Sequence, residues 1–445
     1  MFKRKVTDKL LQWKKTYNGK YAVLLEGARR VGKTTIAECF AKENYKSYIM
    51  IDFSNVSKEM LDVFEDISNL DIFFLRLQSL ASVKLYERNS VIIFDEIQLM
   101  PKVRQSIKHL VKDGRYDYIE TGSLISIKKN VKDILIPSEE VKINVYPLDY
   151  EEFCWACGKD YSIFKKIINY KKPVGQATNR HLMRDFRIYM AIGGMPQAVE
   201  AYLEKKSFQE IDFIKKEIIN LYEDDFRKID PSGRISMIFD SIPSQLASHK
   251  NKFYLSKIVA KKVTTKDKEL LFNLIDSKTV LICYNINDPN IALNLTKDLD
   301  KFKLYILDIG LFTTMLFNDK NLVSENIYNK LLSKKLDANL GYLYENAVAQ
   351  IIAANDRKLY YHTWYDKDKR SSYEVDFITS DNNKIIPIEV KSSDVNNHSS
   401  INKFSDKYSS CISRRILFSQ NDIGHDNMLE LIPIYLAPIV ISLLK

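Results

Sequence analysis

The stretch Gly27-Ala28-Arg29-Arg30-Val31-Gly32-Lys33-Thr34 matches the pattern G-x-x-x-x-G-K-[ST] at every fixed position. Residues 21–25 before it, Tyr-Ala-Val-Leu-Leu, predict a buried strand, and residues 35–41 predict the helix that follows. In this context the two glycines let the backbone curl, so that its N–H groups point inward and hold a polyphosphate at the start of the helix. The stretch therefore predicts a nucleoside triphosphate site; the alternative is an ordinary glycine turn.

Individual residues of this loop have chemical roles in such a site. Lys33 is predicted to reach the β- and γ-phosphates, and the Thr34 hydroxyl to be a ligand of Mg²⁺. The expected cofactors are therefore ATP and Mg²⁺. We expect the rest of the binding loop to consist of Gly27, Ala28, Arg29, Arg30, Val31, Gly32 and Thr35.

Strands and helices continue to alternate after the loop. Further strands are predicted at residues 46–52, 90–94, 116–120 and 141–145. The strand at 90–94, Ser-Val-Ile-Ile-Phe, is apolar at consecutive positions, which is typical of a strand covered on both faces. The pattern predicts an α/β fold, a parallel P-loop NTPase sheet with helices on both sides.

Two acids, Asp95 and Glu96, follow the strand 90–94 directly. Downstream of a phosphate-binding loop, this pattern predicts that Asp95 holds Mg²⁺ through water and that Glu96 polarises the attacking water. Two exposed acids at a strand end are the alternative. The strand 116–120 runs into Thr121-Gly122-Ser123, so we expect the hydroxyls of Thr121 and Ser123 near the γ-phosphate.

The middle of the chain is predicted to be helical and basic. Residues 159–225 have an amphipathic helical pattern, which often forms a lid over a P-loop core. Residues 226–335 contain helices at 254–263 and 266–276 and strands at 280–284 and 302–307, an order that favours a winged helix-turn-helix. Lysines crowd its helical part, either for DNA contact or as a solvated face: Lys250, Lys252, Lys257, Lys261, Lys262, Lys266 and Lys268.

Two alternating segments near the C-terminus predict a hairpin with Asn382-Asn383 as its turn. A two-residue loop places Asp376 opposite Glu389 and Glu374 opposite Lys391. Like charges directly opposed destabilise a sheet, so we expect a cation between these carboxylates.

A helix predicted at 340–352 adds Glu345 at the edge of its apolar face. Glu on a helix, Asp on one strand and Glu-x-Lys on the next resemble the PD-(D/E)XK nuclease pattern. The resemblance implies that Glu345, Asp376 and Glu389 bind Mg²⁺ or Mn²⁺, with Glu374 as an accessory, and that Lys391 positions or activates water. The alternative is a fold relic that binds nucleic acid or pairs subunits.

The whole chain resembles the bacterial and archaeal AAA+-like ATPases that carry a C-terminal domain of unknown function. Besides the motifs above, the resemblance lies in three segments: Tyr146-Pro147-Leu148-Asp149-Tyr150-Glu151-Glu152-Phe153, Gly193-Gly194-Met195-Pro196 and Lys303-Leu304-Tyr305-Ile306-Leu307-Asp308-Ile309-Gly310-Leu311. Relatives usually place a Gly-Arg pair where this chain has residues 136–140, Ile-Pro-Ser-Glu-Glu. An arginine for the phosphates is therefore expected from Arg29, Arg30 or a neighbouring subunit of a homo-oligomer.

Size and composition set the remaining limits. The 445 residues exceed one hydrophobic core, and 67 Lys plus Arg against 57 Asp plus Glu give a net charge of +10. That excess fits contact with a nucleic acid such as DNA, or simply a lysine-rich surface. The five cysteines are scattered, so we expect no disulfide framework and a reducing cytoplasm. The longest apolar stretch, 431–444, contains two prolines and is too short to span a membrane.

We therefore predict a P-loop ATPase core at 1–158, a helical lid at 159–225, a winged-helix-like domain at 226–335 and a PD-(D/E)XK nuclease-like α/β domain at 336–445. The expected function is a Mg²⁺-dependent ATPase coupled to a domain that binds or cuts nucleic acid. The alternative is a nucleotide-switched regulatory protein whose nuclease-like domain is inert.

Overall fold

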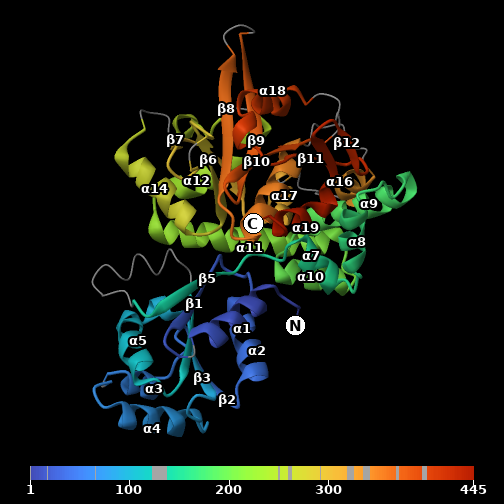
Figure 1. The fold of residues 1–445 in the computed structure, drawn as a ribbon. Coiled ribbons are helices and arrows are strands. Elements are labelled where there is room, and N and C mark those ends of the chain that lie inside the picture. Colours follow the sequence, from blue (N-terminus) through green and yellow to red (C-terminus); the bar gives the residue numbers. More distant parts are fainter. Residues whose placement is uncertain are drawn as a thin grey trace. The chain divides into compact units, whose positions relative to one another are not determined.

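The computed structural model of the chain describes residues 2–17, 19–65, 67–122, 138–248, 251–258, 263–290, 292–317, 325–333, 341–366, 370–392 and 398–444. The chain forms two compact units, whose elements are drawn in Figure 1. The first unit comprises Met1–Tyr146 and Asp276–Lys278, and the second comprises Pro147–Ile275 and Thr279–Lys445.

The first unit is built on a five-stranded parallel sheet in the order β2-β3-β4-β1-β5. Its strands are β1 (Ala22–Glu26), β2 (Ser47–Asp52), β3 (Ser90–Asp95), β4 (Asp117–Gly122) and β5 (Glu140–Asn144). Its helices are α1 (Val6–Tyr17), α2 (Lys33–Asn44), α3 (Lys58–Val63), α4 (Leu70–Ala81) and α5 (Pro101–Asp113), with a 3₁₀ turn η1 (Ile97–Leu99). The predicted strands and the parallel α/β sheet are thus confirmed.

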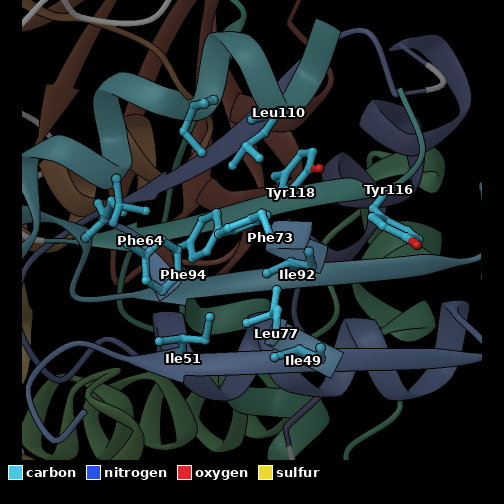
Figure 2. Packing of buried hydrophobic residues seen from close by; sticks show 14 of the residues in the cluster. Ile49, Ile51, Phe64, Phe73, Leu77, Ile92, Phe94, Leu110, Tyr116 and Tyr118 are labelled. Carbon is cyan, nitrogen blue, oxygen red and sulfur yellow. The ribbon is translucent and has the colours of Figure 1, made fainter. Parts of the chain in front are cut away.

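Alternate residues of these strands bury opposite faces of the sheet. On one face, Phe94 stacks with Tyr118 at 6.2 Å between ring centroids and meets Phe64 edge-on, within the aromatic core shown in Figure 2. Side chains of α4 and α5 complete this core. Ile93, the residue before Phe94 on β3, is equally buried but lies outside this aromatic core. Helix α2 packs against the sheet as well. Cover on both faces explains the unbroken apolar runs of the strands.

The second unit begins with a helical region and ends in a sheet with further helices. Its helices are α7 (Tyr150–Ala156), α8 (Ser162–Tyr170), α9 (Gln176–Ile192), α10 (Pro196–Leu203), α11 (Phe208–Ile229), α12 (Arg234–Asp240), α13 (Ile242–Ala247), α14 (Thr265–Asp276), α15 (Ile309–Leu316), α16 (Glu325–Leu332), α17 (Gly341–Ala354), α18 (Ser399–Lys407) and α19 (Ala437–Ser442). Its 3₁₀ turns are η2 (Leu255–Lys257), η3 (Ser409–Cys411) and η4 (Ile434–Leu436). Its strands are β6 (Val280–Ile286), β7 (Lys297–Ile306), β8 (Leu359–Asp366), β9 (Ser371–Asp381), β10 (Lys384–Val390), β11 (Arg415–Ser419), β12 (Gly424–Asp426) and β13 (Leu429–Pro433).

These strands form one eight-stranded sheet in the order β12-β13-β11-β10-β9-β8-β6-β7. The pairs β6–β7, β8–β9, β9–β10 and β12–β13 are antiparallel, and β6–β8, β10–β11 and β11–β13 are parallel. The long β8–β9 hairpin, with α18 beside β9, can be followed in Figure 1. The sheet is therefore mixed, unlike the sheet of the first unit.

The strands predicted as part of a winged helix, β6 and β7, belong to this same sheet. Cys283 of β6 pairs with Leu359 of β8, which gives the backbone groups of β6 partners on both sides. The boundary predicted at residue 335 therefore falls inside one sheet, and the first unit ends at Tyr146 rather than at residue 158. Within the helix predicted at 254–263, the described residues form only the turn η2, and residues 250, 261 and 262 lie outside them.

Three of the family segments meet at one close backbone crossing in the second unit. The Asp308 carboxylate caps α15 by accepting from the Leu311 N–H at 3.0 Å, and it also accepts from the Gly194 N–H at 2.6 Å. The Leu148 N–H donates to the Gly194 carbonyl at 2.7 Å. A Cβ on Gly194 would lie 1.9 Å from the Leu148 oxygen, and one on Gly310 would lie 2.3 Å from the Ile192 oxygen. These glycines are required because backbone approaches backbone here.

Among the described residues, no helix is long and apolar enough to cross a membrane. The apolar stretch at 431–444 instead supplies the end of β13 and the helix α19, which has a proline in its first turn.

Gly194→Ala is predicted to destabilise the second unit by about 1–3 kcal/mol, since the new methyl group meets a backbone carbonyl that cannot move aside. Urea unfolding measures this loss. Gly424→Ala is the matched control, because its Cβ would meet only Leu431 side-chain atoms, the nearest at 3.6 Å. Equal stability of the two variants would contradict this close approach of the Gly194 and Leu148 backbones.

Candidate functional site

The loop between β1 and α2 is curled by three features of its backbone. Arg30 and Gly32 have positive φ angles of 69° and 96°, and Gly32 is the N-cap of α2. A Cβ on Gly27 would lie 2.3 Å from the Val145 oxygen, so only glycine fits beside the end of β5. The loop thus leads directly into the positive end of a helix, as the sequence predicted.

Lys33 is folded back into this loop. Its side chain is buried, and its ammonium donates to the carbonyls of Gly27 at 3.0 Å and Ala28 at 2.9 Å. Burial lowers the pKa of Lys33, and the nearby Glu96 and Asp95 carboxylates only partly oppose this effect. The buried ammonium therefore faces neutral carbonyls, and an anion in the loop would give it a stronger partner.

The Asp95 carboxylate collects the hydroxyls of two threonines. The Thr34 hydroxyl donates to Asp95 Oδ1 at 2.9 Å and lies 3.1 Å from Oδ2. The Thr121 hydroxyl donates to Asp95 Oδ1 and accepts from the Glu96 N–H at 3.3 Å. These residues end β3 and β4 and begin α2, so the structure brings the predicted residues Thr34, Asp95 and Thr121 together. Thr34 and Asp95 have the hard oxygen atoms that suit Mg²⁺.

Glu96 is held by a residue whose role was not predicted from the sequence. Its backbone is left-handed, with φ of 53°, and its carboxylate accepts a hydrogen bond from the Gln98 side-chain amide. Gln98 itself is buried. A carboxamide two residues after the acid pair is the signal that could have been noticed. This bond fixes the direction of the carboxylate that would orient water.

Arg4 is a second contributor that sequence reasoning missed. Its buried guanidinium donates to the Val31 carbonyl in the loop at 3.2 Å and to the Tyr146 carbonyl at 2.5 Å. The sequence shows only that the N-terminus is basic. The remaining loop residues Arg29, Arg30 and Thr35 are exposed, and Ser123 lies outside the described residues.

The carboxylates of the second unit lie on a hairpin with the predicted register. Lys384 pairs with Asp381 and Ile388 with Phe377, and Asn382 in the turn has φ of 52°. The Val390 N–H donates to Asp376 Oδ2 at 2.8 Å, so Asp376 lies beside the end of β10 that carries Glu389.

Amide side chains anchor the helix that carries Glu345. Asn346 accepts from the Ile306 N–H and donates to the Ile306 carbonyl, both at 2.9 Å. Gln350 accepts from the Ile309 N–H at 2.8 Å. These bonds fix α17 against the end of β7 and place Glu345 beside the residues of that strand.

Two residues of β7, Lys303 and Tyr305, complete the cluster and were not predicted as site residues. The Lys303 ammonium lies 2.5 Å from Glu374 Oε1 and 3.8 Å from Glu345 Oε2, and the Tyr305 hydroxyl donates to Glu345 at 3.4 Å. A lysine within the apolar run Phe302–Leu307 was the available signal. Lys303 is thus a cation between carboxylates, supplied by the protein.

The cluster has more carboxylates than lysines to neutralise them. Lys391 pairs with Glu389 at 2.7 Å, while one oxygen of Glu389 and one of Glu374 are buried without a hydrogen-bond partner. Burial raises the pKa of Asp376 well above its usual value, and the carboxylates of Glu345 and Glu389 raise it further. The surplus negative charge must be met by a proton or by a further cation.

The fit of a metal ion to this cluster is partial. Carboxylate oxygens are suitable donors for Mg²⁺ or Mn²⁺, and two of them lack partners. However, no three His, Cys, Asp or Glu side chains among the described residues are grouped closely enough to hold a metal ion. The predicted ligands Glu345, Asp376 and Glu389 therefore do not form a complete metal site, and lysines already contact Glu345 and Glu389.

Other side chains of types that can bind metals or undergo redox chemistry have structural roles. His362 is buried, and its Nδ1 lies 2.6 Å from the Ile286 carbonyl oxygen, so it is a packed side chain. All five cysteines are free thiols. Burial raises the pKa of Cys154 to about 12, so this thiol is not poised for redox chemistry.

Among curated proteins, the chain is similar to the uncharacterized protein MJ1637 of Methanocaldococcus jannaschii, with 24% identity over 271 residues. The match covers 58% of this chain and 54% of that protein, so the chain spans about half of the length of the curated relative it matches.

Three solved structures are similar at low identity. The Walker-type ATPase PABY2304 of Pyrococcus abyssi matches with a TM-score of 0.43 and 16% identity, over 71% of this chain and 96% of that one. The Aeropyrum pernix ORC1 protein, solved in complex with DNA, gives a TM-score of 0.29 and 12% identity over 72% and 93%. The Thermotoga maritima RuvB Holliday junction branch migration motor gives 0.27 and 13% over 58% and 81%.

Three segments of the chain match models of protein families. Residues 183–322 match a domain of unknown function (DUF8612), and residues 340–436 match another (DUF4143). Residues 19–154, which contain the phosphate-binding loop and the parallel sheet, match an AAA domain. The sequence of this segment is therefore similar to that of AAA domains.

Proposed function

We propose that the first unit binds ATP with Mg²⁺ and hydrolyses it. The observation that carries this proposal is the contact of the Thr34 hydroxyl with the Asp95 carboxylate, directly beside the loop that buries Lys33. Bound Mg²⁺ would neutralise phosphate charge between these two oxygen donors. Lys33 would exchange its carbonyl partners for the β- and γ-phosphates, and the loop N–H groups would hold the remaining phosphate oxygens.

In this proposal Glu96 orients the attacking water, and its bond to Gln98 keeps the carboxylate directed. Thr121, hydrogen-bonded to both Asp95 and the Glu96 backbone, would sense the γ-phosphate. Arg29 and Arg30 are exposed on the loop, so one of them, or an arginine from a second subunit of a homo-oligomer, would stabilise the developing charge.

Two substitutions separate binding from hydrolysis. Lys33→Ala removes the buried ammonium and is predicted to weaken ATP affinity roughly 10- to 100-fold in calorimetric titration. Glu96→Gln keeps the shape of the side chain and its place beside Gln98, so this variant is predicted to bind ATP normally. Its rate of phosphate release is predicted to fall by about 100-fold or more.

Lys42→Ala is the matched control for the first variant, because Lys42 lies on the same helix and is largely exposed. It is expected to bind and hydrolyse ATP like the unaltered chain. Undiminished phosphate release by Lys33→Ala would contradict the proposal.

We further propose that the carboxylate–lysine cluster of the second unit acts on nucleic acid, most simply DNA, under control of the bound nucleotide. The convergence of Asp376, Glu389 and Lys391 at one hairpin end supports phosphodiester cleavage, and the net charge of +10 supports contact with a polyanion. The second candidate is a nucleotide-switched regulator with an inert nuclease-like domain. The burial of Lys303 among the carboxylates favours that candidate.

Cleavage assays with Mg²⁺ or Mn²⁺ on single- and double-stranded DNA and on RNA discriminate the two candidates. If the cluster cuts, Asp376→Asn and Lys391→Ala should each lower the rate about 100-fold or more, because each removes a charge from the reacting centre. Asp381→Asn, at the far end of the same strand, is the control and should cut normally. Absence of cleavage by the unaltered chain, with nucleic-acid affinity that depends on ATP, would instead support the regulator.

A further inference from the structure

The Lys303 side chain occupies the centre of the carboxylate cluster as an enclosed cation. It is 6% exposed, and on β7 it lies opposite Cys283 of β6, which is fully buried. Its ammonium contacts Glu374 and Glu345, which come from β9 and α17. Bulk water does not solvate the charge of a lysine buried in this way, so partners within the protein must neutralise that charge.

The neighbouring carboxylates do neutralise it. Glu374 Oε1 lies 2.5 Å and Glu345 Oε2 lies 3.8 Å from the ammonium nitrogen, so carboxylates from two different elements surround the buried charge.

At two carboxylates of the cluster, Glu374 and Glu345, the Lys303 ammonium occupies the place that a further cation would need. The Lys303 ammonium contacts Glu345 and Glu374, and the Lys391 ammonium contacts Glu389. Asp376 lies beside the end of β10 that carries Glu389 and has no lysine as an ion-pair partner among the described residues. The carboxylate oxygens that lack partners lie on Glu374 and Glu389, the residues paired with those lysines. A divalent ion that used Glu374 or Glu345 would thus have to displace, or be repelled by, the Lys303 ammonium.

We propose that Lys303 is a built-in counter-ion that holds the cluster closed to divalent metal ions and limits their affinity. This role deepens the proposed function of the second unit, because it makes occupation by metal depend on movement of β7 relative to β9 and α17. Lys303 acts here as a positioning residue, and this role requires neither nucleic acid nor ATP.

The test measures Mn²⁺ binding by the full chain without nucleotide, by the electron paramagnetic resonance signal of free Mn²⁺. Lys303→Met keeps the volume and apolar stem of the side chain and removes its charge. It is expected to bind Mn²⁺ at least about tenfold more tightly than the unaltered chain, because a nearby positive charge has been removed. Adding Asp376→Asn to this variant is expected to abolish the gain, which locates the ion in the cluster and not beside Thr34.

Lys301→Met is the matched control, since Lys301 lies two residues earlier on the same strand and contacts the Thr363 hydroxyl. It should bind Mn²⁺ like the unaltered chain. If Lys303→Met does not fold, the double variant Lys303→Met/Glu374→Gln removes the ion pair as a whole and leaves three carboxylates for the same measurement. Mn²⁺ affinity that is unchanged or weaker without the Lys303 charge, or equally raised by Lys301→Met, would overturn the proposal.

The outcome is independent of cleavage. An inert second unit would still show the gain in Mn²⁺ affinity, whereas a cutting second unit with no such gain would refute only the counter-ion role of Lys303.

Discussion

The carboxylate of Asp95 is the junction on which the first unit depends. It accepts the hydroxyls of Thr34 and Thr121, so it ties the start of α2 to the ends of β3 and β4. The ends of parallel strands are where open α/β sheets place their ligands, because loops and helix N-termini converge there. The apolar strands around Phe94 form a rigid base for this junction. The side chains of the candidate nucleotide site are thus held by a packed core and not by loops alone.

The two candidate sites differ in the kind of charge that they bury. In the first, the buried Lys33 ammonium contacts only carbonyls at hydrogen-bonding distance, and burial lowers its pKa. In the second, carboxylates outnumber lysines, and burial together with Glu345 raises the pKa of Asp376. Such buried charges cost stability unless a partner of opposite sign arrives. The buried cation of the first site and the excess of carboxylates in the second are thus of opposite sign.

Local patterns were sufficient to predict what short-range rules control. The loop at 27–34, the five parallel strands and the Asn382-Asn383 hairpin register follow from glycine conformation, apolar runs and two-residue alternation. Contacts between distant segments were not predictable in this way. Lys303 reaches Glu374 across intervening strands, and β6 joins β8 through a connection that crosses the expected boundary. The spacing of residues in a single sequence does not predict which distant segments pair. The position of Lys303 in an apolar strand indicates only that this lysine has a buried partner.

Nucleotide binding by the first unit is tested most directly by a crystal structure of the chain grown with Mg²⁺ and a non-hydrolysable ATP analogue. We expect the Lys33 ammonium to leave the carbonyls of Gly27 and Ala28 for the β- and γ-phosphates, with the metal beside Thr34 and Asp95. A structure in which Lys33 keeps its carbonyl partners, while the nucleotide is absent or bound elsewhere, would contradict this expectation.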